Sequence, residues 1–187
     1  MKAQIGTTVG IGTLLAILFL SWWVARNASR SPASLNIAPR DRESLLPEMR
    51  NGRLIGLVPE RQEEWVLTFQ KGRYDPDRKE AVVETAICQV IRRSERVAVF
   101  RAPRIQVFFD EKRMMMTGGV TVRAVGRNWQ VRLPSAVWNW GTGDLSGTGP
   151  VRMEGQHVVA IGKALSGNTN DLQVTLVGEV QVQWLRL

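Results

Sequence analysis

A glycine-rich segment is the first place where this sequence could bind a phosphate. Residues 141–149 read GTGDLSGTG. A Walker-type phosphate loop needs a Lys at a fixed distance from its glycines and a following helix whose amino terminus receives the phosphate. The segment has no Lys, and the residues after it do not predict a helix. We therefore interpret it as the glycine-rich turn of a β-hairpin.

Nucleophilic catalysis would depend on His157 or Cys88, because the chain has one His and one Cys. Ser146 and Asp144 lie near His157 in the sequence, but a catalytic triad needs a Ser on a strained turn, and no Gly-x-Ser-x-Gly motif is present. Cys88 lies in an apolar segment and carries no sign of a lowered pKa. We predict a histidine on the surface or an edge strand and a packed, unreactive thiol.

Acid–base chemistry would require a pair of carboxylates facing each other across a cleft. Asp75 with Asp77, and Asp110 with Glu111, are close in sequence, but both pairs fall on predicted turns, where solvated carboxylates are the simpler interpretation. One Cys and one His are also too few for a zinc site of the Cys/His type. The sequence therefore predicts that the protein is not an enzyme and that it needs no cofactor and no metal.

The positive charge of the chain is spread out. With 25 Lys and Arg against 17 Asp and Glu, the formal charge is +8 over 187 residues, a length typical of one domain. Residues 26–59 and 60–127 hold most of the excess, whereas residues 128–187 are neutral. A nucleic-acid surface usually concentrates its basic residues on one face. The distribution therefore argues against nucleic acid and leaves a membrane or another anionic partner.

The amino-terminal residues predict a membrane anchor. Residues 5–24 contain no charged side chain, and at about 1.5 Å per residue they are long enough to cross a hydrocarbon core of about 30 Å. Trp22 and Trp23 then lie where interfacial aromatic residues are expected, and Arg26 follows them. The positions that represent this transmembrane segment are Ile5, Leu14, Leu20 and Val24.

A cleaved signal peptide is the alternative for this segment. The small residues that cleavage requires are missing, since Trp23 and Arg26 occupy the positions three residues before the plausible sites. We therefore predict an uncleaved anchor over residues 1–26. Its orientation is not decided by charge, because Lys2 on one side and Arg26 and Arg30 on the other nearly balance.

A tether is predicted between this anchor and the rest of the chain. Residues 27–59 contain four prolines with several Ser and Arg, a composition typical of a loosely ordered linker. One short strand is predicted near residues 54–58. The folded domain is then expected over residues 60–187.

From Trp65 onward, apolar and polar residues alternate. The apolar positions form five runs: Trp65, Leu67, Phe69; Ile105, Val107, Phe109; Trp129, Val131, Leu133; Ala136, Trp138, Trp140; and Val180, Val182, Trp184. A period of two is typical of β-strands with one buried and one solvated face. Since no sustained helical periodicity occurs, the predicted fold class is all-β.

The strands also repeat at intervals of about 30 residues. Pro103, Val107, Phe109, Val120 and Val122 recur 31 residues later as Pro134, Trp138, Trp140, Val151 and Met153, and the last two recur again as Val180 and Val182. We interpret this as four stacked pairs of antiparallel strands, which bury one continuous apolar face. Three of the repeated strands restart after Gly118-Gly119, Gly149-Pro150 and Gly178-Glu179, whereas the first unit has Cys88 at that position.

Anchor, tether and four strand-pair units together resemble the LptC and OstA-like family of lipopolysaccharide-export proteins. The most family-like stretch spans residues 100–122 and contains Ala102, Phe109-Asp110 and Thr117-Gly118-Gly119-Val120; Thr148-Gly149-Pro150-Val151 echoes it. The resemblance covers residues 5–24 and 65–184.

This resemblance implies a fold, a location and a function. The fold would be a twisted β-jellyroll of two antiparallel sheets in the periplasm, held by one helix in the cell inner membrane. The protein would receive lipopolysaccharide from an inner-membrane ABC transporter complex, which hydrolyses the ATP, and pass it to a periplasmic bridge protein of the same fold. Its acyl chains would occupy an apolar slot between the sheets.

Sixteen residues are predicted to line this slot, from the alternation and the resemblance together; the alternation by itself fits an ordinary packed core between two sheets equally well. They are Trp65, Leu67, Phe69, Ile105, Val107, Phe109, Val120, Val122, Trp129, Val131, Trp138, Trp140, Val151, Met153, Val180 and Val182. Candidates for phosphate contact at its mouth are Arg101, Arg104, Arg123 and Arg132, although a solvated strand face is the favoured interpretation for each of them taken singly.

Unpaired strand edges at the two ends of the stack would bind other proteins. The last strand, within residues 172–184, would meet the bridge protein, and residues 54–69 would meet the transporter. The alternative from another class is a membrane-anchored structural or polysaccharide-binding β-repeat protein that uses exposed tryptophans.

Overall fold

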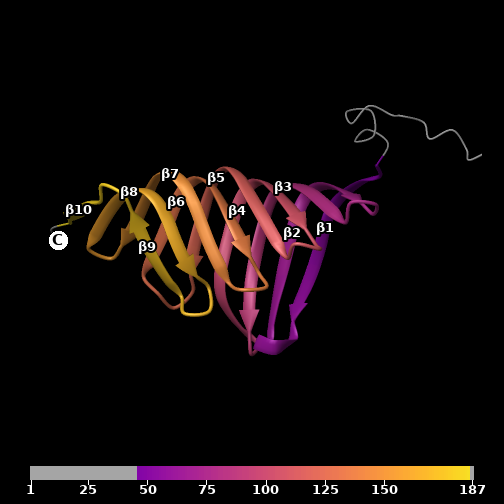
Figure 1. The fold of residues 1–187 in the computed structure, drawn as a ribbon, viewed down its shortest axis with the longest axis horizontal. Helices are drawn as coiled ribbons and strands as arrows, with labels where there is room; N and C mark the ends of the chain where they lie inside the picture. The colour runs from indigo at the N-terminus through magenta and orange to yellow at the C-terminus, as the bar shows by residue number, and fades with distance from the viewer. Residues whose placement is uncertain (1–45, 186–187) are drawn as a thin grey trace, which may run out of the picture. The chain divides into compact units, whose positions relative to one another are not determined.

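The computed structural model describes residues 46–185, and these residues form one antiparallel β-sheet (Figure 1). The predicted membrane anchor, including Ile5, Leu14, Leu20 and Val24, and most of the predicted tether lie outside the described residues. Within residues 46–185, no helix has the length and apolar character needed to cross a membrane.

Ten strands and one short 3-10 helix make up the described part of the chain. They are β1 (Glu48–Val58), η1 (Pro59–Arg61), β2 (Glu63–Asp75), β3 (Glu80–Arg92), β4 (Glu95–Phe108), β5 (Arg113–Ala124), β6 (Trp129–Asn139), β7 (Asp144–Gly155), β8 (Val158–Asn168), β9 (Gln173–Val177) and β10 (Gln181–Trp184). The strands pair in chain order from β1 to β8, and β9 and β10 both pair with β8. In Figure 1 they lie side by side from β1 at one end to β10 at the other.

The predicted turns are confirmed, but the domain starts earlier than predicted. Residues 76–79, 109–112 and 140–143 connect consecutive strands, as the sequence indicated, and residues 169–172 connect β8 to β9. β1 begins at Glu48, within the range 27–59 that we assigned to the tether, and it pairs with β2 along most of its length. The strand predicted near residues 54–58 is thus the second half of a longer edge strand that belongs to the sheet.

Each long strand bends near its middle, and the bends form one line across the sheet, which we name the bend line. It passes through Asn51, Gln70, Thr85, Pro103, Gly118, Gly119, Pro134, Gly149, Pro150, Lys163 and Gly178. From β4 to β8 the pairing register shifts at this line. Prolines cannot donate to the ladder, and glycines adopt the positive φ that a bulge requires, so this composition interrupts the pairing.

The repeat seen in the sequence is a repeat of these bends. Gly118, with φ of +87°, faces the ring of Pro103, and Gly149, with φ of +103°, faces the ring of Pro134 on the neighbouring strand. In the first unit the positive φ of +52° belongs to Thr85, three residues before Cys88. The departure from the glycine pattern is therefore at Thr85, and Cys88 is an ordinary strand residue.

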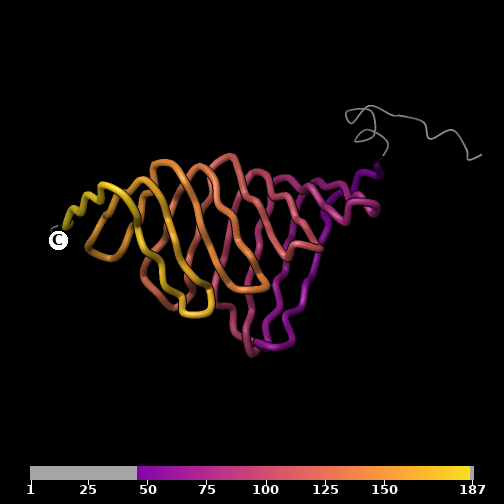
Figure 2. The backbone as a smooth tube through the Cα atoms, viewed as in Figure 1, coloured from indigo at the N-terminus to yellow at the C-terminus, as the bar shows by residue number. Residues whose placement is uncertain are grey.

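The bend line divides the sheet into two halves that pack face to face. Half-sheet A contains residues 52–58, 63–69, 86–92, 95–102, 120–124, 129–133, 151–155, 158–162 and 181–184; half-sheet B contains residues 48–50, 71–75, 80–84, 104–108, 113–117, 135–139, 144–148, 164–168 and 173–177. The ring of Phe100 in half-sheet A lies 5.1 Å from that of Trp138 in half-sheet B. Figure 2 follows the backbone as it turns over between the halves.

Candidate lipid-binding interior

The space between the half-sheets is lined by the apolar side chains of every long strand. Eleven of the sixteen predicted slot residues are buried there: Trp65, Leu67, Phe69, Ile105, Val107, Val120, Val122, Val131, Trp138, Trp140 and Val151. Phe109, Trp129 and Met153 are partly buried and pack against the same core. Alternation placed these side chains correctly because opposite residues of paired strands share one face.

Val180 and Val182 differ from the others, since they are 44% and 55% exposed. Val182 pairs with Ala160, and Ala160 pairs with Met153, so Val182 extends the inner face rather than the outer one. Trp184 follows on the same face and is 74% exposed. The inner face is therefore open to solvent at the β10 end, where no further strand among the described residues covers it.

Several inner residues were not on the predicted slot list. Cys88, Val90, Phe100, Met114 and Met116 are fully buried and belong to the same cluster. Burial raises the pKa of the Cys88 thiol, which therefore stays protonated. The prediction of a packed cysteine is confirmed by its burial.

Packed aromatic rings close the interior between β2 of half-sheet A and the end of β6 in half-sheet B, and we name this region the closed end. Trp65 and Trp140 lie 5.1 Å apart between ring centroids, and Trp138 and Trp140 lie 6.5 Å apart. The indole N–H of Trp138 donates to the hydroxyl of Thr169, which itself donates to the carbonyl of Gly143. An acyl chain could reach this part of the interior only if the half-sheets moved apart.

A cluster of three charged residues spans the half-sheets at the rim of the closed end, and we name it the rim clamp: Arg61, Glu63 and Arg92. The Glu63 side chain is fully buried and accepts hydrogen bonds from Arg61 at 3.1 Å and from Arg92 at 2.6 Å. Because Glu63 pairs with Arg92 in the β2–β3 ladder, both side chains lie on the inner face of half-sheet A. The sequence analysis did not identify this cluster.

Both arginines of the rim clamp also donate to main-chain carbonyls of the opposite half-sheet. Arg92 donates to the carbonyl of Asn170 at 3.0 Å and to that of Thr169 at 3.1 Å, in the turn between β8 and β9. Arg61 donates to the carbonyls of Trp140 and Gly141, in the turn between β6 and β7. The rim clamp therefore connects the start of β2 and the end of β3 to two turns of half-sheet B.

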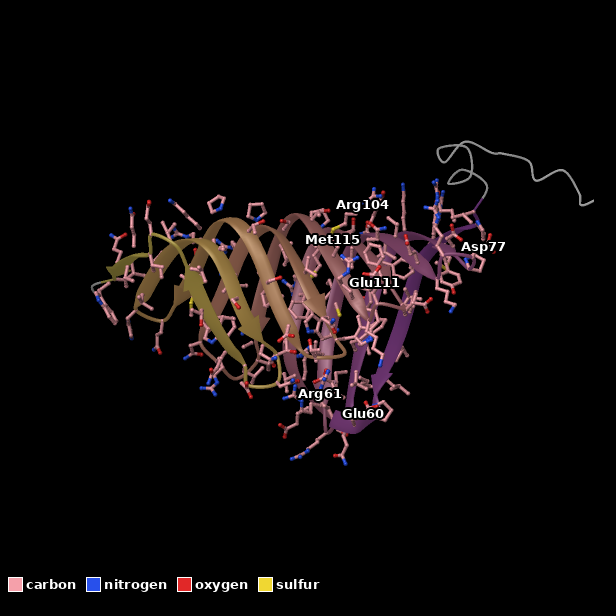
Figure 3. All side chains as sticks on the ribbon, viewed as in Figure 1. Glu60, Arg61, Asp77, Arg104, Glu111 and Met115 are labelled. Carbon is pink, nitrogen blue, oxygen red and sulfur yellow. The ribbon has the colours of Figure 1, made fainter. Side chains whose placement is uncertain are left out.

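The four arginine candidates for phosphate contact lie on the outer face, the solvated position that the sequence analysis favoured for each of them. Arg101 and Arg132 pair with Thr121, one position away from the buried inner row, and Arg123 pairs with Gln130. Arg104 lies on the outer face of half-sheet B, next to buried Ile105. In Figure 3 it is at the upper edge of the sheet, whereas Arg61 is at the lower edge. The register decides this, since neighbouring residues of a strand face opposite sides.

These outer-face arginines have two kinds of surroundings. Arg132 and Arg152 both pair with Glu154, and the pKa of that carboxyl is lowered by its hydrogen bonds from Arg152 and Gln130. Arg101 instead lines a groove of about 600 Å³ beside the bend line, together with Ile87 and Thr121.

The groups that suggested chemistry in the sequence serve as turn contacts. Asp75 accepts hydrogen bonds from the amides of Asp77 and Arg78, and Asp110 pairs with Lys79. The glycine-rich segment forms the turn before β7 and the first residues of that strand. Among residues 46–185, no three His, Cys, Asp or Glu side chains are arranged to hold a metal ion.

The tryptophans of the described residues are mostly hidden from solvent. Trp65, Trp138 and Trp140 are buried and Trp129 is partly buried, whereas Trp184 is exposed at the end of β10. A polysaccharide platform would need several exposed rings on one face. The geometry of residues 46–185 therefore does not favour the polysaccharide-binding alternative.

The fold and its inner face define a class of protein, a β-jellyroll made from one sheet that is bent along a line, with an apolar interior and two free sheet edges. The chain belongs to the LptC family: the family model described as "Lipopolysaccharide-assembly, LptC-related" matches residues 13–184. This confirms the resemblance found in the sequence. The comparison with curated proteins gives no match.

Among solved structures, the protein is similar to LptH, described as the LptA-homologous periplasmic component of the lipopolysaccharide transport device of Pseudomonas aeruginosa. The two share 6% sequence identity with a TM-score of 0.56, over 69% of this chain and 100% of that one. At this identity the likeness establishes the fold alone. Family and fold together support a part in lipopolysaccharide transport.

Proposed function

We propose that this protein is a membrane-anchored lipid-transfer component that holds the acyl chains of lipopolysaccharide between its half-sheets. The observation that carries the proposal is the inner face, which is apolar along every long strand and open at the β10 end. Acyl chains need such a continuous apolar surface, whereas phosphates and sugars stay solvated at the rim. The protein forms no covalent bond with its ligand and needs no cofactor.

The two ends of the sheet differ, and the difference indicates the direction in which the lipid would pass. Aromatic rings close the interior beside β2, and Ile55 and Leu57 are exposed on the neighbouring edge strand β1. At the β10 end the edge strand is short, its apolar residues Val182 and Trp184 are exposed, and so is Val180 just before the strand. Exposed apolar edge strands favour pairing with another sheet. In the proposed function the β1 edge meets the inner-membrane ABC transporter complex, and β10 meets a periplasmic bridge protein of the same fold.

The anchor at residues 5–24 would hold the protein in the inner membrane, with the jellyroll in the periplasm. Co-purification tests this arrangement. The full chain, solubilised from membranes in mild detergent, is expected to retain an ATP-driven transporter and to acquire lipopolysaccharide only when ATP is supplied. Substituting Leu14→Arg within the anchor should abolish retention of the transporter. A chain that purifies without any transporter and without lipid, before and after ATP addition, would contradict the proposal.

A further inference from the structure

The rim clamp is an unusual way to close an apolar interior. Glu63 is fully buried with two arginines, each of which is only 20% exposed. Burying an ion pair costs desolvation, and an apolar contact at this place would generally stabilise the fold as well or better. Its energetic cost suggests that the cluster does something other than stabilise the closed form.

Two features identify what the cluster could bind. Each guanidinium divides its N–H groups between one carboxylate and the carbonyls of an opposite turn, and Arg92 makes these bonds at 2.6–3.1 Å. One buried donor of the clamp, Nε of Arg61, has no acceptor among the described residues, and neither has Nε1 of Trp65, which lies against Gly56 of β1. Buried N–H groups are usually paired, so Nε of Arg61 remains able to donate to a ligand oxygen. Guanidinium groups bind phosphate oxygens through paired hydrogen bonds.

We infer that Arg61 and Arg92 form the phosphate-binding gate of the interior. In the closed form they donate to the carbonyls of Trp140, Gly141, Thr169 and Asn170 and hold the half-sheets together. When an anionic lipid arrives, its phosphate oxygens replace these carbonyls and also accept from Nε of Arg61. The released turns let the half-sheets part, and acyl chains replace the lost contact between Phe100 and Trp138.

This inference rests on the proposed function for its ligand, but the gate can be tested separately because Cys88 reports on opening. Cys88 is the only cysteine in the chain and lies on the inner face of β3, four residues from Arg92. A buried thiol with a raised pKa reacts with a thiol reagent only when the interior opens.

The first experiment measures the labelling rate of Cys88 in the full chain in detergent micelles. Arg92→Gln is expected to label about ten-fold faster than the unsubstituted protein, since hydrogen bonds to charged groups keep the gate closed. Arg132→Gln removes an arginine paired to a glutamate on the outer face and should leave the rate unchanged. Val151→Ala, a core change in half-sheet A, controls for labelling that occurs through global unfolding. Its labelling rate is compared with that of Arg92→Gln under conditions where the two variants are equally stable. If Arg92→Gln does not fold, Arg61→Gln replaces it.

The second experiment tests the phosphate. A photo-reactive residue at position 138 is exposed to purified lipopolysaccharide, to the same lipid after dephosphorylation, and to lipopolysaccharide with excess inorganic phosphate. The unsubstituted gate should give more adduct with the phosphorylated lipid, and Arg92→Gln should lose that preference while Arg132→Gln keeps it. Competition by inorganic phosphate alone would mean that free phosphate, rather than the lipid headgroup, opens the gate.

The two readouts separate the inference from the proposed function. Labelling of Arg92→Gln no faster than that of Val151→Ala, or an unchanged preference for phosphorylated lipid, would overturn the gate. No lipid adduct in any variant would overturn the proposed function and the lipid role of the clamp. The labelling rate would then decide whether the clamp closes the interior at all.

Discussion

At the bend line, Gly149 and Gly119 have almost the same backbone conformation but different neighbours. Their φ values are +103° and +98°; a Cβ on Gly149 would lie 2.8 Å from Cγ of Pro134, whereas a Cβ on Gly119 would meet nothing within 4 Å. An alanine at a positive φ costs about 1–2 kcal/mol. We therefore expect Gly119→Ala to destabilise by about that amount and Gly149→Ala by clearly more, because the Pro134 ring must also move.

Urea unfolding of the two variants measures this difference. The pair is matched, since both residues lie on the bend line and one contact separates them. Equal losses of stability would mean that the glycine–proline contacts do not determine the bend.

Asp144 gives a prediction about pH. Hydrogen bonds from the Thr142 hydroxyl and the Asn168 amide lower the pKa of its carboxyl below the ordinary value of 3.8. A lowered pKa in the folded state means that the unfolded chain binds a proton more readily. The resulting stabilisation is therefore present above the ordinary pKa and is lost as the pH falls through the lowered value.

The Asp144→Asn variant removes this titration. The free energies of unfolding of the two proteins should differ more at pH 7 than at pH 3, with the unsubstituted protein more stable at pH 7. This difference in free energy is expected to be small because the side chain is exposed. A difference in the free energy of unfolding that grows toward low pH would contradict the lowered pKa of Asp144.

Among the strands, β10 combines exposure with an open edge. All four of its residues are exposed, so its removal should cost little stability. Truncating the chain after residue 178 is expected to leave the urea midpoint nearly unchanged and to abolish capture of a bridge protein of the same fold. Ile161→Ser, a change to an exposed residue on the adjacent strand β8, should keep capture. Capture that survives the truncation would place the bridge contact elsewhere.

For the strands, the sequence predicted the positions well and the bends only in part. Alternation identified the inner face from Trp65 to Met153, because a half-buried strand has a period of two. The glycines and prolines gave the repeat, but not its meaning as a line of bends, and the positive φ at Thr85 had no compositional signal. The length of β1 was underestimated because Asn51 and Gly52 interrupt its apolar pattern.

The rim clamp could not be predicted for a different reason. Glu63 and Arg92 look like ordinary solvated charges in the sequence, since 29 residues separate them. Only the register of β2 and β3, together with two distant turns, brings them into one buried cluster. The four arginine candidates lie on the outer face because they alternate with the buried residues of their strands.

Over residues 46–185 as a whole, the two ends of the interior differ. Tryptophan rings and the rim clamp close it near β1, whereas Val182 and Trp184 leave it exposed at β10. Opening the closed end exposes apolar surface at about 25 cal/mol per Å², a cost that bound acyl chains would offset. A lipid would thus be admitted at one end and remain accessible at the other.

The central claim is that lipid lies between the half-sheets, and site-specific photo-crosslinking along β4 in membranes tests it most directly. Ile105 and Val107 face the interior, and Gln106 between them faces outward. Adducts to lipopolysaccharide are expected from photo-reactive residues at positions 105 and 107 and not from position 106. Adducts at position 106 alone, or none at any inward position, would contradict the claim.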